Sequence, residues 1–390
     1  MRTALALVAL LAVGAILISG GSRADSVRHH YLPESNELRT VNHYGSVREV
    51  SVRSLGDPRA IRARPRRLAR ARPLGASAPP WAQRMYERSL LVLHGLTEPD
   101  GAVIAGAREG WDYVWPRDAG TAAIAFAAAG YRGEARRIAR FLLGLDLSAA
   151  ARFYPDGSPV SGRAAQGDAA GWVAAAARAA GLRSLPASLP WEDRADYQEG
   201  EPGDYVADAI ASTAVSHAND SGRATARRQP EAGPLRGLFA TPDGTLSRRA
   251  GDPESGLDSA AAWAVRPFPL PALFPLARRT LLRLAAESGR FGIVPSQDWD
   301  GGEDPWTAPT AWTAWSLAAL AQRDRLRGSE TVARRERAAA LRLMAALRRD
   351  ATPAGLLPER VDARTGVPTS TTPLAWAHAF AILALRRLWP

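Results

Sequence analysis

The chain has 390 residues, 46% of them hydrophobic, which is enough for one large domain or two ordinary ones. It contains no cysteine, so disulfides, thiolate metal sites and a cysteine nucleophile are excluded. The formal net charge of +11 comes from arginine alone, since all 50 basic residues are Arg and none is Lys. A high-GC genome would produce this bias, whereas a phosphate-binding surface draws on both cations and gathers them on one face. We therefore expect no nucleic-acid partner.

Only one dense arginine cluster, within residues 59–72, supports a competing interpretation as a binder of nucleic acid or anionic lipid. The six histidines show no HExxH or similar ligand spacing, so we expect no histidine-held catalytic metal and no cofactor. A calcium ion held by carboxylates stays open at this point.

The first 24 residues have the pattern of an export signal. Met1-Arg2 is followed by an apolar run over Ala4–Ile18 and by small residues up to Ala24. The run is shorter than the roughly 20 residues that a bilayer span needs. We expect export to the cell envelope or beyond, with membrane association only through this segment if it is not cleaved.

Residues 25–80 are rich in Arg, Ser and Pro, and we assign them to a linker or small appendage, with one β-like piece over Val47–Val52.

From residue 81 onward the pattern is helical. The predicted helices are Trp81–Leu96, Ala119–Ala129, Gly133–Leu145, Asp168–Ala180, Asp204–Ala218, Leu257–Val265, Pro271–Glu287, Thr307–Arg323, Ser329–Arg349 and Pro373–Leu388. Ser329 and Thr372 stand where an N-cap is expected, with Pro373 in the first turn.

These helices are of two kinds. Ser329–Arg349 has an Arg- and Glu-rich face opposite an apolar stripe, as an outer helix should, whereas Ala119–Ala129, Thr307–Leu320 and Leu374–Leu385 are apolar nearly all round. Their alternation predicts an all-α fold in which residues 81–390 form an (α/α)6 toroid of helical hairpins. An open helical solenoid is the alternative that periodicity alone allows.

Polar, aromatic-rich loops stand directly before apolar helices, and in a toroid such loops open at one end. In Trp111–Asp118, indoles offer flat faces to sugar rings, while Arg117 and Asp118 offer a donor fork and an acceptor to vicinal hydroxyls. The alternative is that Asp118 caps a helix and Trp115 lies in the core. Ala165–Asp168 follows, with Asp168 equally suited to an N-cap.

Two later loops and one polar stretch complete the set. Trp299–Trp306 is acidic and glycine-rich, without EF-hand spacing, and brings Trp306 to a helix start. Glu359, fixed behind Pro358 at the mouth of an apolar helix, suits a base whose pKa must be controlled. The alternative is an ordinary surface position, which is usual for a Pro-Glu pair in a loop. If Glu192 in Leu189–Arg194 packs beside the Trp191 indole, the neutral form of its carboxyl group would be favoured, as a general acid requires.

Together, in this order, these segments resemble the glucoamylase-type glycoside hydrolases, family 15. Glu87–His94, Gly101–Ala105 and Trp111–Asp118 resemble the family's first helix and first catalytic loop, and Leu357–Asp362 with Pro373–His378 resembles its last loop and twelfth helix. The likeness spans residues 82–390 and is loosest in the middle.

The resemblance implies an inverting, exo-acting α-glucosidase acting on oligosaccharides or α-glucans. It implies that Glu359 is the general base, that Ser370 supports it and that Glu192 is the general acid. The candidate substrate contacts are Trp111, Trp115, Arg117, Asp118, Gln166, Asp168 and Trp306. Inversion requires carboxyl groups about 6.5–9.5 Å apart.

The sequence also departs from the family pattern. Only 25 residues separate Gln166 from Trp191, so the outer helix expected there is short or missing, and Glu199 and Glu201 rival Glu192 as the acid. Ile293–Gln297 replaces an Arg-Tyr segment that the family often carries. These departures keep a second hypothesis open, namely a degenerate toroid that binds glycans or assists at the envelope without hydrolysis. Malto-oligosaccharides, trehalose and isomalto-oligosaccharides are the candidate substrates of the enzyme.

Overall fold

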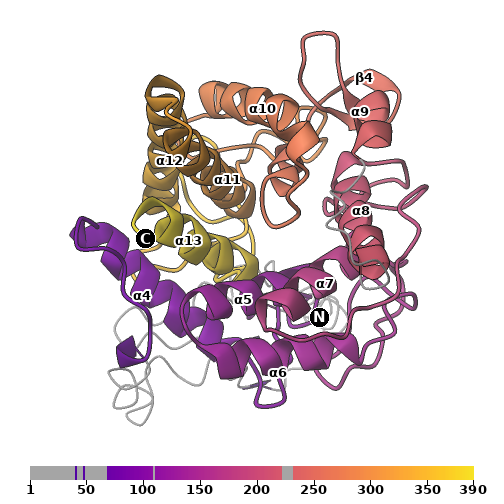
Figure 1. The fold of residues 1–390 in the computed structure, drawn as a ribbon. Helices are drawn as coiled ribbons and strands as arrows, with labels where there is room; N and C mark the ends of the chain where they lie inside the picture. Colours follow the sequence, from indigo (N-terminus) through magenta and orange to yellow (C-terminus); the bar gives the residue numbers. More distant parts are fainter. Residues whose placement is uncertain (1–39, 42–46, 49–67, 109, 222–231) are drawn as a thin grey trace, which may run out of the picture.

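The structure is a computed structural model that describes residues 40–41, 47–48, 68–108, 110–221 and 232–390. Six helical segments form an inner ring: α5 (Pro116–Ala128), α7 (Ala169–Ala179), α8 (Val206–Ser221), η1 (Ser259–Ala264), α11 (Thr307–Leu326) and α13 (Ala375–Leu388). Each contacts the next in this order, and α13 returns to α5, so the ring is closed (Figure 1). The predicted toroid is confirmed, and the open solenoid is excluded.

Composition explains which helices lie inside. In α13 every residue from Ala375 to Leu385 is buried, because alanines alternate with large side chains and leave no polar face. Its single polar residue in this stretch, His378, is satisfied by hydrogen bonds to Ser89 and to the backbone of Leu357. A helix that is apolar all round is stable only when other elements surround it.

The outer helices are α4 (Pro80–Gly95), α6 (Arg132–Leu143), α9 (Gly233–Phe239), α10 (Phe274–Glu287) and α12 (Glu330–Asp350). They are amphipathic. In α6, for example, Ala135, Ile138, Ala139 and Leu142 are buried, while the arginines on the other face are exposed. No helix lies between α7 and α8 in residues 181–205, so the expected loss of an outer helix is confirmed, and this stretch forms a long irregular loop.

Several predicted helix boundaries were wrong, and those at Leu257, Pro271 and Pro373 affect the loops of the ring. Leu257 ends strand β4 (Asp252–Leu257), which pairs antiparallel with β3 (Ser247–Arg249), and the helical turn that follows is a 3-10 helix. Asp258 separates the two, because its carboxylate accepts the Ala260 N–H at 2.6 Å and caps the turn. A short 3-10 turn, η2 (Pro271–Leu273), precedes α10.

Another boundary that differs is the start of α13, which was predicted at Pro373 and lies at Ala375. Leu374 holds the N-cap position there, so Thr372 does not cap the helix. Ser329 does stand at the N-cap of α12, but its side chain makes no capping hydrogen bond.

The end of the predicted linker packs on the ring. The Arg72 N–H donates to the Ala129 carbonyl at 2.8 Å, and the Gly75 N–H donates to Trp389 at 3.1 Å. Farther upstream, β1 (Thr40–Val41) pairs antiparallel with β2 (Val47–Arg48).

The predicted export signal, residues 1–24, lies outside the described residues. Within the part of the chain that is described, no helix has both the length and the apolar character needed to cross a bilayer.

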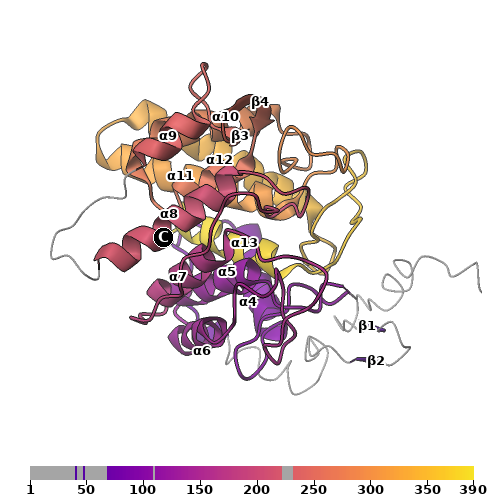
Figure 2. The same cartoon turned by 90° about the vertical axis from the view of Figure 1, so that its right-hand side faces the viewer.

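Aromatic rings fill the centre of the toroid. Trp172 of α7 meets Trp263 of η1 edge to face at 5.0 Å between ring centroids, and Trp312 of α11 lies 4.8 Å from Trp376 of α13. The long loops leading into α11 and α13 emerge on one side of the molecule (Figure 2). The packed rings therefore form the floor beneath these loops.

Candidate active site

A cavity of ≈ 190 Å³ opens among the loops that precede the inner helices. Its lining residues come from distant parts of the chain: Ala105, Gly110, Trp111, Trp115, Arg117, Asp118, Arg152, Arg163, Tyr197, Gln198, Glu199, Trp306, Glu359, Leu374 and Trp376. Four indoles and three carboxyl groups thus share one small space. Of the substrate contacts expected from the sequence, Trp111, Trp115, Arg117, Asp118 and Trp306 lie in this wall.

Glu359 is held firmly at the cavity. Its backbone N–H donates to the Thr371 carbonyl, and its carbonyl accepts the Thr307 N–H, both at 2.9 Å. The Ser370 hydroxyl donates to its Oε2. Burial raises the pKa of Glu359, while the hydrogen bond from Ser370 and the charge of Arg360 act in the opposite direction. Ser370 therefore supports this carboxylate.

His378 fixes the segment just before Glu359. Its Nε2 accepts the Leu357 N–H at 2.9 Å, and its Nδ1 lies 2.9 Å from the Ser89 hydroxyl. Burial lowers the pKa of His378 to about 3, so the ring is neutral near pH 7. A neutral ring that accepts at Nε2 carries its proton on Nδ1 and donates it to Ser89.

The second cavity carboxyl group belongs to Glu199. Its Oε1 accepts the Trp115 indole N–H at 2.8 Å, and its Oε2 forms an ion pair with Arg163. The backbone at Glu199 is left-handed, with φ of 58°, and its N–H donates to the Asp196 carbonyl at 2.9 Å. Because a non-glycine residue is strained in this region, the surrounding contacts must hold it.

The structure does not bring Glu192 to the cavity. Its side chain is exposed and accepts the N–H of its own neighbour, Trp191, at 3.1 Å. Glu201 is exposed as well, and its carbonyl accepts the Tyr205 hydroxyl. The sequence-based assignment of the acid to Glu192 therefore has no geometric support, whereas Glu199, named as its rival, lies in the cavity wall. The irregular loop between α7 and α8 turns Glu192 outward.

A buried arginine anchors the segment that presents Glu199. Arg248 of β3 lies 3.1 Å from Asp196, 3.6 Å from Asp258 and 2.8 Å from Asp298. Burial raises the pKa of Asp258 to about 7, although the charge of Arg248 opposes the shift. These ion pairs connect the β3–β4 hairpin, the start of η1 and the loop before α11 to the residues just before Glu199.

Neutral side chains complete this network. The Tyr197 hydroxyl donates to Asp258 at 2.8 Å, and the Gln198 amide donates to the Tyr197 oxygen at 3.1 Å. The Ser296 hydroxyl donates to Gln198 at 3.1 Å. Both neighbours of Glu199 on its N-terminal side are therefore fixed to other elements.

Arg117 is almost fully buried and is oriented from behind the cavity. One of its terminal nitrogens donates to Gln166 at 3.0 Å and to Asp168 at 2.9 Å, and its guanidinium carbon lies 4.8 Å from the Trp376 ring centroid. Gln166 and Asp168 are not in the cavity wall. They position Arg117, so Asp168 acts as its counter-ion, although it also occupies the N-cap position of α7.

Asp118 is buried beside both Arg117 and Glu359. Burial raises its pKa to about 7, the positive charge of Arg117 lowers it, and the negative charge of Glu359 raises it further. The Arg117–Asp118 contact measures 3.9 Å. Near neutral pH this carboxyl group thus exists in both forms, and either form can hydrogen-bond a sugar hydroxyl.

Several residues of the cavity wall were not predicted from the sequence. Arg152 and Arg163 lie in a loop without helical periodicity, and Trp376 reads as one more apolar residue of α13. One signal was available for Glu199: the run Asp196–Glu199 stands just before an apolar helix, α8, as the other site loops do.

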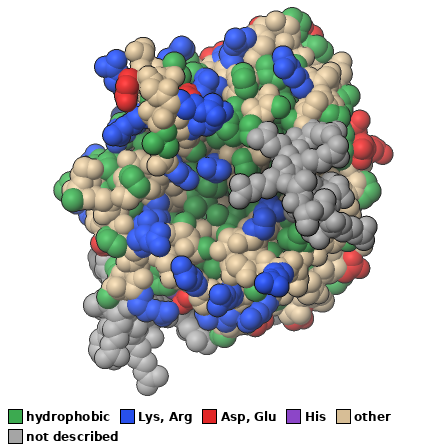
Figure 3. Space-filling model, in the orientation of Figure 1, with side chains coloured by type: hydrophobic (Ala, Val, Ile, Leu, Met, Phe, Trp, Pro, Cys, Tyr) green, Lys and Arg blue, Asp and Glu red, His purple; other side chains and the backbone are tan. Residues whose placement is uncertain are grey.

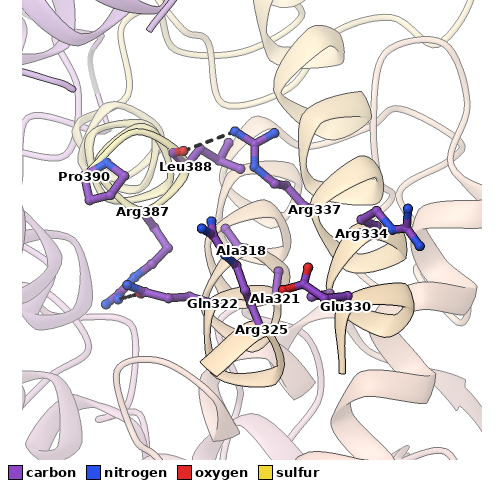
Figure 4. A pocket seen from close by; sticks show the side chains of 11 residues that line it. Ala318, Ala321, Gln322, Arg325, Glu330, Arg334, Arg337, Arg387, Leu388 and Pro390 are labelled. Carbon is purple, nitrogen blue, oxygen red and sulfur yellow. Dashed lines mark hydrogen bonds between the residues drawn. The ribbon is translucent and has the colours of Figure 1, made fainter. Parts of the chain in front are cut away.

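A larger groove of ≈ 360 Å³ lies at the opposite ends of α11 and α13, and it differs in character. Four arginines and Glu330 line it, and the guanidinium groups of Arg334 and Arg387 lie on its opposite sides (Figure 4). Arginines are also scattered over the upper, left and lower parts of one face of the molecule, with apolar and neutral side chains between them (Figure 3). The groove contains neither an acid pair nor an indole, so it is not the candidate active site.

Within the described ranges, no group of three or more His, Cys, Asp or Glu residues could hold a metal ion. No protein-family model matches the sequence, and no curated protein matches it significantly.

Solved structures, in contrast, match well. A glycosidase variant in complex with glucose has a TM-score of 0.61 at 20% identity, covering 79% of this chain and 97% of its own. A glucoamylase from Saccharomycopsis fibuligera has a TM-score of 0.61 at 14% identity, covering 79% of this chain and 94% of its own. A bacterial glucoamylase complexed with acarbose has a TM-score of 0.57 at 17% identity, and the match covers 78% of this chain but only 55% of that protein. The chain therefore has the six-hairpin toroid fold of glucoamylases and related glycosidases.

Proposed function

We propose that this protein is a glycoside hydrolase that uses Glu199 as general acid and Glu359 as general base. The observation that carries the proposal is the placement of both carboxyl groups in one cavity walled by Trp111, Trp115 and other indoles. Aromatic faces bind the apolar faces of sugar rings, and paired carboxyl groups supply the proton transfers of glycoside hydrolysis. Glucoamylases and glycosidases of the same fold, some solved with glucose or acarbose, support a sugar substrate.

The reaction would invert the anomeric configuration. Glu359 takes a proton from water, and the water oxygen attacks the anomeric carbon. The bond to the glycosidic oxygen breaks as Glu199 protonates that oxygen, so the leaving unit departs as an alcohol and both carboxyl groups exchange their protonation states. Arg117 and Asp118 would bind hydroxyls of the terminal glucose. Malto-oligosaccharides, trehalose and isomalto-oligosaccharides are the proposed substrates, and export to the envelope or beyond remains a prediction from the N-terminus.

The test is product analysis with matched variants. Purified protein should release β-glucose first from one of these α-glucosides, as followed by NMR of the anomeric proton. Glu359→Gln and Glu199→Gln should each lower kcat by at least about 100-fold, because general acid and base contributions are of this size. Glu192→Gln, a matched change in the same loop, should retain activity. Loss of activity in Glu192→Gln with full activity in Glu199→Gln would refute the assignment of the acid.

A second function has one specific observation in its favour. The Glu199–Arg163 ion pair stabilises the charged form of Glu199, whereas a general acid must carry a proton. A toroid that binds glycans without cleaving them would tolerate this pair. Calorimetric binding of an oligosaccharide, without any product after long incubation, would establish this second function and exclude hydrolysis.

A further inference from the structure

The charges of the cavity are unevenly distributed. Among the described residues, three arginines line it, and two of them have a carboxylate partner: Arg117 pairs with Asp168, and Arg163 pairs with Glu199. The third is Arg152. Among the residues that the structure describes, no carboxylate lies within 4.0 Å of its guanidinium group, and its Nε is buried without a hydrogen-bond partner.

Arg152 is nevertheless held in place. Its guanidinium carbon lies 4.7 Å from the ring centroid of Tyr113 and 5.5 Å from that of Trp115. Stacking on aromatic faces leaves the edge of a guanidinium group, with its N–H donors, available to a ligand. The same Trp115 donates to Glu199, so Arg152 lies on the side of the cavity that holds the proposed acid.

Arg163 adds a second positive charge at this side. The Ala151 N–H donates to the Arg163 carbonyl at 3.2 Å, and the Val160 N–H donates to the Arg152 carbonyl at 3.0 Å, so one folded loop carries both side chains. Burial lowers the pKa of Arg163, the nearby charge of Arg152 lowers it further, and the negative charge of Glu359 raises it. Two positive charges on one loop repel each other, and an anion bound beside them would relieve this repulsion.

Catalysis would increase the excess of positive charge on the side of the cavity that holds Arg152 and Arg163. When Glu199 carries the proton that it must donate, Arg163 loses the negative charge of its partner. Both arginines then face the leaving unit, because the acid always stands on the side of the departing oxygen.

We propose that the leaving-group side of this cavity binds a sugar or aglycone that carries an oxyanion, such as a carboxylate or phosphate, and that Arg152 determines this specificity. Guanidinium groups bind such oxyanions through two parallel hydrogen bonds, which are about twice as strong as neutral ones. The inference rests on the proposed function only for the identity of the leaving side, since the binding preference itself requires no turnover.

The test uses two disaccharides that differ in one group. Maltose has a CH2OH on its reducing unit where 4-O-α-D-glucopyranosyl-D-glucuronate has a carboxylate. Calorimetry on the Glu359→Gln protein gives the ratio of their dissociation constants, and kcat/KM gives the ratio for the wild type. We expect the acidic disaccharide to be favoured roughly tenfold or more, and the preference to shrink with added salt.

Variants assign the preference to its residue. Arg152→Gln should reduce the ratio to near unity, and Arg152→Lys should retain part of it. The control Arg334→Gln, a matched change in the groove at the other end of the ring, should leave the ratio intact. Equal binding of the two disaccharides by the wild type, or an unchanged ratio in Arg152→Gln, would overturn the proposal. Preferential binding without hydrolysis of either sugar would instead refute the hydrolase function and leave the specificity standing.

Discussion

The Trp115 indole donates to Glu199 at 2.8 Å, and 84 positions of sequence separate the two residues. The first loop of the toroid therefore orients a carboxyl group that belongs to a loop two inner helices later. The hydrogen bond fixes Oε1 and leaves Oε2 to Arg163.

Replacing Trp115 by Phe should keep an aromatic wall and remove this donor. We expect kcat to fall by up to about tenfold, because the proposed acid loses a hydrogen bond of about 0.5–1.5 kcal/mol that orients it. Steady-state kinetics on a maltooligosaccharide would measure it. An unchanged kcat would show that the indole N–H does not orient Glu199.

Arg248 is expected to act as a positioning residue, since its three carboxylate partners surround the segment before Glu199. Arg248→Gln leaves buried carboxylates without their counter-ion, a loss of about 3–5 kcal/mol in the free energy of unfolding. Among molecules that remain folded, kcat should fall more than KM rises, because the proposed acid is displaced while the proposed sugar contact, Arg117, stays in place.

Two further variants separate the effect of Arg248 on the position of Glu199 from its effect on the stability of the fold. Arg248→Lys keeps the charge and should restore part of kcat. Arg283→Gln, which removes exposed ion pairs to Asp243 and Glu287, should cost at most about 1 kcal/mol and leave kcat unchanged. Thermal unfolding and kinetics on the three proteins give both readouts, and a loss of stability without any change in kcat would contradict the positioning role.

Ser370→Ala should change the pH dependence of activity. The Ser370 hydrogen bond lowers the pKa of Glu359, so its removal raises that pKa. A general base works only when deprotonated, and the acidic limb of the kcat/KM profile should therefore move to higher pH. Ser370→Thr retains the hydroxyl and should keep the limb in place. A limb that stays fixed in Ser370→Ala would mean that it reports another group.

Asp350, at the end of α12, should make the fold less stable as pH rises. It is buried, its two carboxylate oxygens have no hydrogen-bond partner within the described residues, and burial raises its pKa from 3.8 to about 8. The folded state then binds the proton more tightly than the unfolded state does, so stability is full below about pH 4 and declines as pH rises to about 8.

Asp350→Asn removes this titration. Its melting temperature should exceed that of the wild type at pH 8 and approach it at pH 5, with a difference in unfolding free energy on the order of a few kcal/mol at the higher pH. Thermal unfolding at several pH values is the measurement. A wild-type protein whose melting temperature is as high at pH 8 as at pH 5, with no gain in the variant, would contradict the buried acid.

The sequence by itself determined most of the helices and the alternation of inner and outer ones, although the short outer helix α9 was not predicted. The spacing of apolar residues along a helix predicts whether one face or all faces are buried. This spacing identified α12 as an outer helix and α13 as an inner helix without any contact information. The loop of the proposed base could also be found from the sequence, because Glu359 and Ser370 lie 11 positions apart in one short segment.

Only the tertiary structure decided the other half of the site. Glu192 and Glu199 stand in the same irregular loop, where no periodicity indicates which side chain faces inward. Trp115, Arg163 and the network around Arg248 come from three distant segments, and these contacts hold Glu199 in a strained backbone at the cavity wall. Long-range packing selects between two neighbouring carboxyl groups, and local sequence contains no record of that packing.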